Sequence, residues 1–157
     1  MIKQDTRDMT ARSYILPDPE TQPAFYADVP PKRFLAWVID GVLIGILCIL
    51  ILPFTAFTGI FFFPFLFLVV GFIYRVLTLA GGSATWGMRM VGIEFRAQTG
   101  DRFDLGAAIL HTLGYSISIA MPLLQIISII LMLTSRRKQG LTDHFMGSVA
   151  INRAARF

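Results

Sequence analysis

Two apolar stretches of about membrane-spanning length follow a polar N-terminal segment. The first is Phe34–Leu52, which ends at Pro53, and the second is Ile60–Ala80. Each approaches the ~20 residues that a helix needs to cross the ~30 Å hydrocarbon core of a bilayer. The link Phe54–Ile60 carries no charge, so we expect the two stretches to form a tight helical hairpin that crosses the membrane twice.

A third apolar stretch, Leu105–Ser135, is too long for one straight span. At 1.5 Å per residue, its roughly 31 residues would extend over ~46 Å, and Pro122 near its middle should break or kink a helix. A single crossing would place the basic cluster Arg136–Lys138 on the side of the membrane opposite Lys32 and Arg33, against the preference of Lys and Arg for the cytoplasmic side. We therefore expect two short helices that meet near Pro122, as a hairpin or a re-entrant pair. A surface helix followed by one crossing is the alternative.

The segments between and after these stretches predict a small β structure. Gly81–Gly87 is rich in turn residues, and polar and apolar residues alternate in Val91–Arg96. With a turn at Gly100-Asp101, this pattern predicts a small β-hairpin on the cytoplasmic surface. Ser148–Asn152 could add a third strand.

Composition places the chain among membrane proteins. Of the 157 residues, 55% are hydrophobic and only 15% are charged, outside the usual range of soluble domains. The net charge is +4, but the basic residues flank apolar stretches, which indicates anionic lipid headgroups as partners and excludes nucleic acid. The expected fold class is an all-α membrane protein. It is a small helical bundle with two full spans, a proline-broken third apolar region and a minor cytoplasmic β-hairpin cap.

The chain divides into one membrane domain and two tails. Residues 1–31 hold five of the eight prolines and no apolar core, so we expect a disordered or extended cytoplasmic tail. The membrane domain covers residues 32–152, and residues 153–157 form a C-terminal tail. Both termini are expected in the cytoplasm.

One carboxylate lies inside the first apolar stretch. Asp40 follows Arg33 by seven residues, with no other charge between Phe34 and Phe57. A carboxylate at that depth costs about 2.5–3.5 kcal/mol on insertion scales, so it should face inward and be partnered. Arg75 lies at a matching depth on the second stretch. We predict an ion pair of ionised Asp40 with Arg75, and Arg33 as a second donor, because a guanidinium can satisfy both oxygens of a carboxylate.

A polar stripe follows the third apolar stretch. Its members are spaced so that they share one helix face, and we expect them to face Asp40 and Arg75; they are Asp104, His111, Tyr115, Ser118 and Gln125. Histidine changes charge near neutral pH, so His111 is a candidate proton relay. The alternative is that the stripe only forms hydrogen bonds between helices.

Other candidate sites carry little chemistry. Gly41 and Gly45 form a G-x-x-x-G on the first stretch, a face for helix packing within the chain or in a dimer. Cys48 is the single cysteine, so no internal disulfide is possible. No nucleophile, phosphate-binding or zinc-protease motif occurs, and the adjacent pair Asp143-His144 is not a metal site by itself. We expect no enzyme activity, no cofactor and no metal.

The residues above resemble the RDD family of bacterial membrane proteins, named for one arginine and two aspartates. The segment from Arg33 to Asp40 matches the first arginine and aspartate. Gly82–Gly92 carries Thr85, Gly87, Arg89 and Gly92 of the family's loop, and Gly140–Ile151 matches the segment with the second aspartate, Asp143. The resemblance covers roughly residues 32–152. Many relatives have an arginine in place of His111, and the glycine-serine pair at 147–148 often reads glycine-threonine.

The resemblance implies a multi-pass protein of the bacterial cytoplasmic membrane and leaves its activity open. We expect proton- or cation-linked transport through the polar site Arg33, Asp40, Arg75 and His111, in an oligomer. The alternative is a non-catalytic adaptor or accessory subunit of a larger membrane complex. We expect a structural clamp in which Asp143 bonds Arg89 or caps its own turn, and so joins the C-terminal segment to the loop after the second span.

Overall fold

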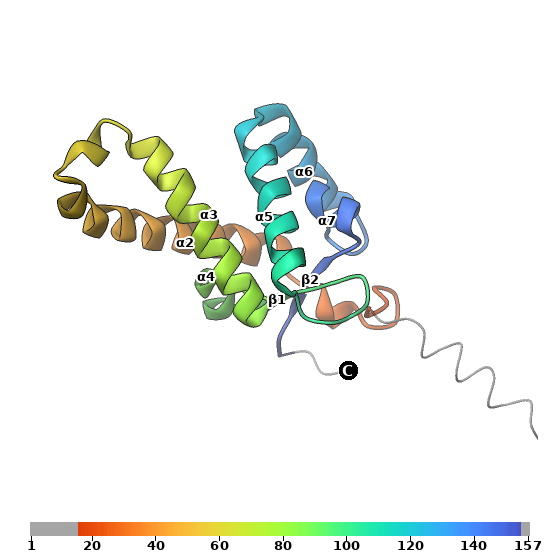
Figure 1. Cartoon of the computed structure of the whole chain (residues 1–157). Helices are drawn as coiled ribbons and strands as arrows, with labels where there is room; N and C mark the ends of the chain where they lie inside the picture. The colour runs from red at the N-terminus through yellow and green to blue at the C-terminus, as the bar shows by residue number, and fades with distance from the viewer. Residues whose placement is uncertain (1–15, 155–157) are drawn as a thin grey trace, which may run out of the picture.

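The computed structural model describes residues 16–154, and two of its helices are long and apolar enough to cross a membrane. They are α2 (Val29–Ile51) and α3 (Phe63–Gly82), about 34 Å and 30 Å long at 1.5 Å per residue. Two short 3-10 turns, η2 (Leu52–Thr55) and η3 (Thr58–Ile60), connect them at one end of a hairpin (Figure 1). The two predicted spans are confirmed, and the chain is a membrane protein.

The first span begins earlier than predicted, at Val29 instead of Phe34. Pro30 and Pro31 lie in the first turn of α2, where the missing backbone N–H of proline is not needed and its fixed φ favours the helix. Proline marks a helix start in the same way at Pro64 of α3.

The third apolar region is broken, as predicted, at Pro122. The helices α5 (Leu105–Ala120) and α6 (Pro122–Thr134) are bent by 116° relative to each other. Met121 between them is extended, with φ −115° and ψ 100°, because proline disfavours the helical conformation in the residue before it. Neither helix reaches 30 Å alone, so the pair is a broken span or a re-entrant pair.

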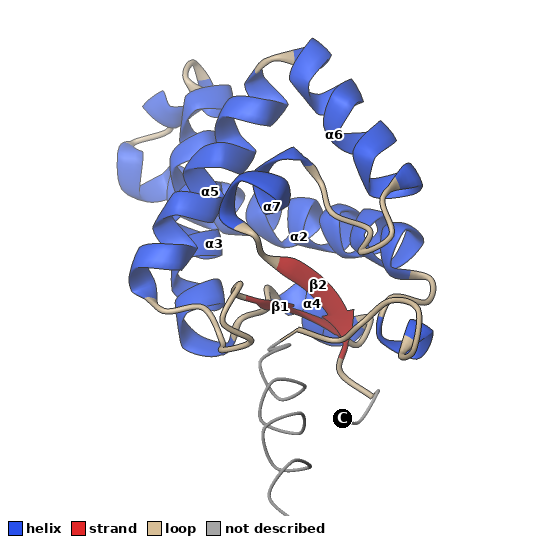
Figure 2. Ribbon diagram, turned by 90° about the vertical axis from the view of Figure 1, so that its right-hand side faces the viewer, coloured by secondary structure: helices blue, strands red, loops and turns tan. Residues whose placement is uncertain are grey.

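A two-stranded antiparallel sheet lies at the opposite end of the bundle from the α2–α3 link (Figures 1 and 2). The strands are β1 (Ile93–Arg96) and β2 (Val149–Asn152), paired with Ile93 opposite Asn152. The small β cap is confirmed, but the predicted local hairpin through Gly100-Asp101 is wrong. The C-terminal segment supplies the partner strand because its apolar residues are fully buried there, whereas the residues at 101–102 are charged and exposed.

Residues 16–31 are ordered, so the predicted disordered or extended tail is wrong for this part. A short 3-10 turn, η1 (Pro23–Phe25), precedes α2, and the Tyr26 hydroxyl donates to the carbonyl of Pro17 at 2.7 Å. Apolar side chains of this segment pack on β2 in one cluster of Leu16, Phe25, Tyr26, Val149 and Ile151. Residues 1–15 and 155–157 of the two predicted tails lie outside the described residues.

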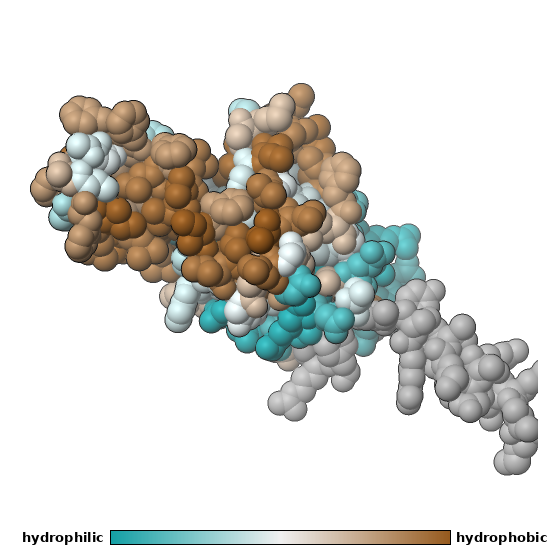
Figure 3. Space-filling model, viewed as in Figure 1, coloured by the Kyte–Doolittle hydropathy of each residue, from teal (hydrophilic) through white to brown (hydrophobic). Residues whose placement is uncertain are grey.

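The apolar core is concentrated at the sheet end of the bundle. It joins the sheet to α2, α3 and α5 through buried residues such as Val29, Leu79, Ile93 and Phe95. Along the membrane helices, by contrast, many large apolar side chains are exposed, and Figure 3 shows them covering the α2–α3 hairpin and α5 while hydrophilic residues gather below. The exposed apolar surface is the surface that lipid would contact.

Candidate functional site

Asp40 is buried and joins three helices. Its Oδ1 accepts hydrogen bonds from the Tyr74 hydroxyl on α3 at 2.7 Å and from the backbone N–H of Gly87 at 2.8 Å. Its Oδ2 accepts from the Thr85 hydroxyl at 2.6 Å. Thr85 is the N-cap of the short helix α4 (Trp86–Met90), so a single carboxylate of α2 holds both α3 and α4.

The close approach of α4 to α2 requires glycine at position 87. A Cβ there would lie 2.3 Å from the carbonyl oxygen of Ala36 and 2.8 Å from Oδ1 of Asp40. Thr85 completes the arrangement because its hydroxyl also accepts from the N–H of Met88 at 3.2 Å while it donates to Asp40. The threonine and glycine of the loop after α3 are therefore explained by this carboxylate.

Arg75 lies beside Asp40, as predicted, but it is not the main partner. Its Nη1 is 4.0 Å from Oδ2 of Asp40, longer than a hydrogen bond. Its Nη2 donates to the Tyr115 hydroxyl at 3.3 Å, and its guanidinium lies 4.3 Å from the centre of the Tyr115 ring. Neutral donors, namely Tyr74, Thr85 and a backbone amide, satisfy the carboxylate in its place.

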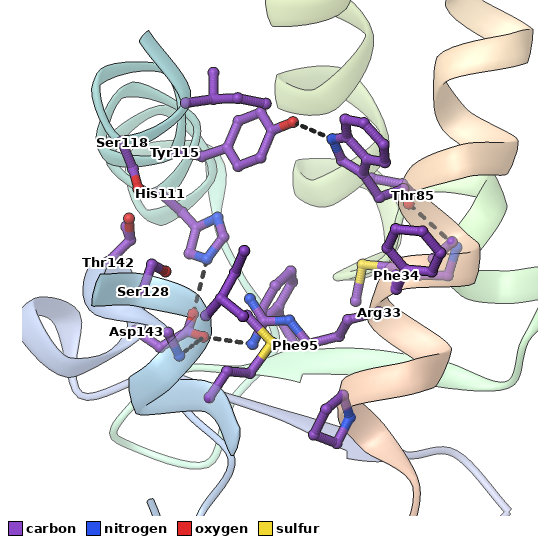
Figure 4. A pocket seen from close by; sticks show the side chains of 18 of the residues that line it. Arg33, Phe34, Thr85, Phe95, His111, Tyr115, Ser118, Ser128, Thr142 and Asp143 are labelled. Carbon is purple, nitrogen blue, oxygen red and sulfur yellow. Dashed lines mark hydrogen bonds and ion pairs between the residues drawn. The ribbon is translucent and has the colours of Figure 1, made fainter. Parts of the chain in front are cut away.

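Asp143 forms a second buried centre, on the short helix α7 (Leu141–Met146). Its Oδ2 accepts from Nη1 of Arg33 at 2.5 Å and from the N–H of Gly140 at 3.0 Å. Its Oδ1 contacts Nε2 of His111 at 2.9 Å and accepts from the Ser148 hydroxyl at 3.2 Å. Arg33 from α2 and His111 from α5 converge on Asp143 (Figure 4), which thereby ties α2, α5 and the C-terminal segment together.

Two predicted pairings are wrong. Arg33 bonds Asp143 instead of Asp40, because side chains on a helix lean toward its N-terminus, so Arg33 extends away from Asp40. Arg89 does not reach Asp143 within the described chain. Its Nε and Nη2 donate to the backbone carbonyls of Ala84 and Thr78, at 3.2 and 3.3 Å, and so close the end of α3. Asp143 does cap its own turn, the other option for that residue.

The electrostatics of Asp143 determine which nitrogen of His111 carries a proton. Burial raises the pKa of Asp143, but Arg33 and His111 together lower it by more than burial raises it. The pKa of Asp143 therefore lies well below its usual range. An ionised carboxylate only accepts hydrogen bonds, so Nε2 of His111 is the donor, a tautomer assigned from the bonding. No described group bonds Nδ1 of His111, and that atom is not sealed from solvent. Nδ1 of His111, a residue that lines the space described next, is therefore left without a hydrogen-bond partner in the described chain.

That space is a cavity of about 650 Å³ between α2, α3, α5, α6 and α7. Five of its lining residues are arginine, aspartate or histidine: Arg33, Asp40, Arg75, His111 and Asp143. Four residues of the predicted polar stripe also line it, namely His111, Tyr115, Ser118 and Gln125, and Ser118 donates to Gln125 across the break at Pro122 at 3.0 Å. Asp104 does not belong to this set: it is exposed and caps α5 by accepting from the N–H of Ala107.

The remaining predicted positions do not contribute to the cavity. A Cβ on Gly41 or Gly45 would meet nothing within 4 Å, so the expected packing of these glycines inside the chain is not found and their face is open. Among residues 16–154, no group of three metal-ligating side chains occurs. Cys48 is buried and unpaired.

Sequence reasoning missed the principal partners of Asp40. Tyr74 gave no signal, because a tyrosine in a membrane helix is common near polar groups. The loop motif gave a signal for Thr85 and Gly87 that could have been used, since a threonine two residues before a glycine fits an N-cap at a close helix contact. The Arg33–Asp143 pair could also have been considered, because both residues are named in the family motif.

Comparison with known proteins yields one family. The family model described as the RDD family matches residues 29–147, which is most of the chain and includes both buried carboxylates, Asp40 and Asp143. No curated protein and no solved structure matches the chain.

Proposed function

Because the chain belongs to the RDD family and two of its helices are apolar enough to cross a membrane, we propose that it is a small transport protein. In this proposal the cavity binds the solute, and the His111–Asp143 pair takes up and releases a proton. The protein would lie in the bacterial cytoplasmic membrane with both termini in the cytoplasm.

The observation that carries the proposal is the cavity itself. Its volume of about 650 Å³ falls in the ~300–1,000 Å³ range of small-molecule sites. Ionisable residues inside a membrane protein usually mark the path of an ion or substrate, and here all five line one space. Nδ1 of His111 has no described hydrogen-bond partner, so in this proposal it exchanges the proton without breaking the contact of Nε2 with Asp143.

Asp40 is better suited to holding the helices than to carrying a proton. Three donors already bond its two oxygens, and protonation would break at least one of these bonds. In the proposed mechanism Nδ1 of His111 accepts the proton, the ionised Asp143 stabilises the resulting imidazolium through Nε2–H, and Arg33 keeps Asp143 in place. Asp40, which the sequence led us to expect as part of the ion site, instead holds α3 and α4 against α2.

The remaining features of the proposal concern assembly and partners. The bent pair α5–α6 adds at most one further span, and a chain with so few spans would form a complete path with a second copy, so we propose a homo-oligomer. The open face at Gly41 and Gly45 suits a neighbouring helix. Anionic lipid headgroups would meet the basic residues at the sheet end, and neither enzyme activity nor nucleic-acid binding is proposed.

Proton flux in vesicles tests the proposal. Purified protein would be reconstituted with an entrapped pH indicator, and a pH gradient would be imposed. We expect flux that His111→Gln abolishes, because glutamine keeps a hydrogen-bond donor but cannot take up a proton. His144 is the only other histidine, and its Nδ1 contacts its own helix turn, so His144→Gln is the matched control. Absence of flux, or equal flux in His111→Gln, would reject transport.

An adaptor or accessory subunit is the second candidate. The observation that favours it is that each buried carboxylate joins three elements, as a purely structural role requires. Purification in mild detergent would distinguish the two, because an adaptor should retain a larger partner in fixed stoichiometry and show no flux.

A further inference from the structure

Most of the hydrogen-bond donors of the Arg75 side chain have no partner in the described chain. A guanidinium has five N–H donors, yet the only hydrogen bond that the guanidinium of Arg75 donates in the described chain is from Nη2 to the neutral Tyr115 hydroxyl. Nη1 of Arg75 is 4.0 Å from Oδ2 of Asp40, whose two oxygens already accept from three other donors. The unbonded nitrogens of Arg75 are not sealed off, its side chain is 15% exposed, and it lines the cavity. Arg33, the other arginine of the cavity, is held by Asp143.

The charges around the cavity favour a monoanion. The two guanidinium groups of α2 and α3 balance the two carboxylates of α2 and α7, and α6 contributes only neutral side chains such as Gln125 and Ser128. A proton on His111, which the proposed function requires, leaves one net positive charge. One bound oxyanion would neutralise it, and a planar guanidinium suits a carboxylate or phosphate oxyanion.

The cavity opens sideways, between α2 and α6. Large apolar residues that line it and are also exposed on the outside mark the opening: Phe34 and Trp37 on α2, and Ile129 and Leu133 on α6. Figure 2 shows the courses of α2 and α6, the two helices that supply these residues. All four side chains are apolar or aromatic and belong to the apolar helices, so the opening faces lipid and not water.

We propose that the cavity binds an anionic amphipath from the bilayer, a molecule with one apolar chain and an oxyanion headgroup. The headgroup lies at Arg75, and the chain leaves between Phe34 and Trp37 on one side and Ile129 and Leu133 on the other. This names the substrate class of the transport proposed above and in that sense rests on it. The proposal differs from an ordinary lipid contact because the headgroup enters the protein and bonds a guanidinium at bilayer depth.

Trp37 provides a reporter for binding. It lines the cavity and donates Nε1–H to Tyr115, the residue that also contacts Arg75. The only other tryptophan is Trp86, which does not line the cavity, so Trp86→Phe leaves a single fluorophore. The full chain with that substitution would be placed in phosphatidylcholine nanodiscs. The probe is stearic acid with a nitroxide in mid-chain, and its methyl ester is the uncharged probe of the same shape.

We expect saturable quenching of Trp37 by the acid, and only weak, non-saturable quenching by the ester. Loss of a charge-assisted hydrogen bond should weaken binding of the acid by about 10- to 100-fold in Arg75→Gln, with Arg75→Lys in between. Arg136, which is exposed outside the cavity, gives the control variant Arg136→Gln with unchanged binding. The comparison of acid with ester needs no variant, so it decides the matter even if an Arg75 variant does not fold.

Each contrary result has a definite meaning. Equal quenching by acid and ester, or unchanged binding in folded Arg75→Gln, would show only apolar lipid in the groove and overturn the proposal. Displacement of the probe by millimolar inorganic phosphate would show a site for free anions and overturn the bilayer source. Binding requires no gradient, so saturable binding without proton flux would remove transport alone, and flux without binding would remove this inference alone.

Discussion

Replacing Asp143 with asparagine should destabilise the protein more than any other single change of similar size. The substitution preserves the shape of the side chain but removes its charge and one of its two acceptor atoms. Asp143 accepts from Arg33 and Gly140 through Oδ2, and contacts His111 and Ser148 through Oδ1. An amide group cannot accept at both positions, so at least one pair of donors is left facing an N–H₂ group.

The expected cost follows from burial. Asp143 is fully buried and the side chain of Arg33 is 16% exposed. Removing one partner of a buried ion pair costs about 3–5 kcal/mol because the other charge stays buried without compensation. Arg33 retains its contact with the Phe95 ring, 5.1 Å away, and a path toward solvent, so we expect the lower end, about 3 kcal/mol.

Unfolding in mixed micelles of mild detergent and sodium dodecyl sulfate would measure this cost, with tryptophan fluorescence as the signal. Asp101→Asn, in an exposed loop, is the control and should leave the midpoint unchanged. A double-mutant cycle with Arg33→Met separates the pair from its parts: the double variant should be more stable than the sum of the single losses predicts. A loss below about 1 kcal/mol in Asp143→Asn, or full additivity in the cycle, would refute the argument.

Three further predictions use the same assay. Asp40→Asn should cost only about 1–2 kcal/mol, since two of its three partners are hydroxyls that can turn to accept from an amide; a loss as large as that of Asp143→Asn would contradict the geometry. Gly87→Ala should cost about 1–3 kcal/mol through overpacking, whereas Gly81→Ala, where a Cβ meets nothing within 4 Å, should be neutral; equal effects would show that α4 does not pack closely on α2. The pKa of Asp143 is lowered in the folded state, so its stabilisation is present above about pH 4, the ordinary Asp range, and is lost as the pH falls further. Asp143→Asn should therefore reduce the loss of stability that the protein shows below about pH 4. An unchanged loss of stability in that variant would assign the acid sensitivity to other groups.

The membrane topology was largely predictable because it depends on length and composition. A stretch of about 20 apolar residues has few alternatives in a bilayer, so α2 and α3 follow from the sequence. Pro122 likewise breaks the third region through local sterics. The same local rules failed where order depends on distant packing. Residues 16–31 have few local signals, and contacts with β2, through Val149, Ile151 and Asn152, hold them in place.

The site was predictable in its members and not in its pairings. Asp40, Arg75 and His111 could be identified because polar groups in lipid must face the interior, and all three line the cavity. Pairing depends on side-chain direction and on which loops return to the bundle. The lean of Arg33 toward the start of α2, and the return of the C-terminal segment to pair with β1, brought Asp143 to Arg33. Neither fact can be inferred from the spacing of polar residues along one helix.

The cavity also explains why its residues are distributed over the whole chain. Arg33 and Asp143 are 110 positions apart and meet through one hydrogen bond. Such a long-range contact joins the helical hairpin to the C-terminal segment in the folded structure. The polar centre therefore serves both to fix the fold and, in the proposed function, to exchange the proton.

The state of the His111 ring tests this account most directly. Nitrogen-15 spectra of histidine-labelled protein in nanodiscs, recorded at about pH 8 where histidine is ordinarily neutral, would report both ring nitrogens, with His144→Gln to assign them. We predict that Nε2 of His111 carries the proton and bonds Asp143, while Nδ1 is bare. A proton on Nδ1, or an Nδ1 already engaged in a hydrogen bond, would contradict a nitrogen open to the cavity and with it the proposed exchange site.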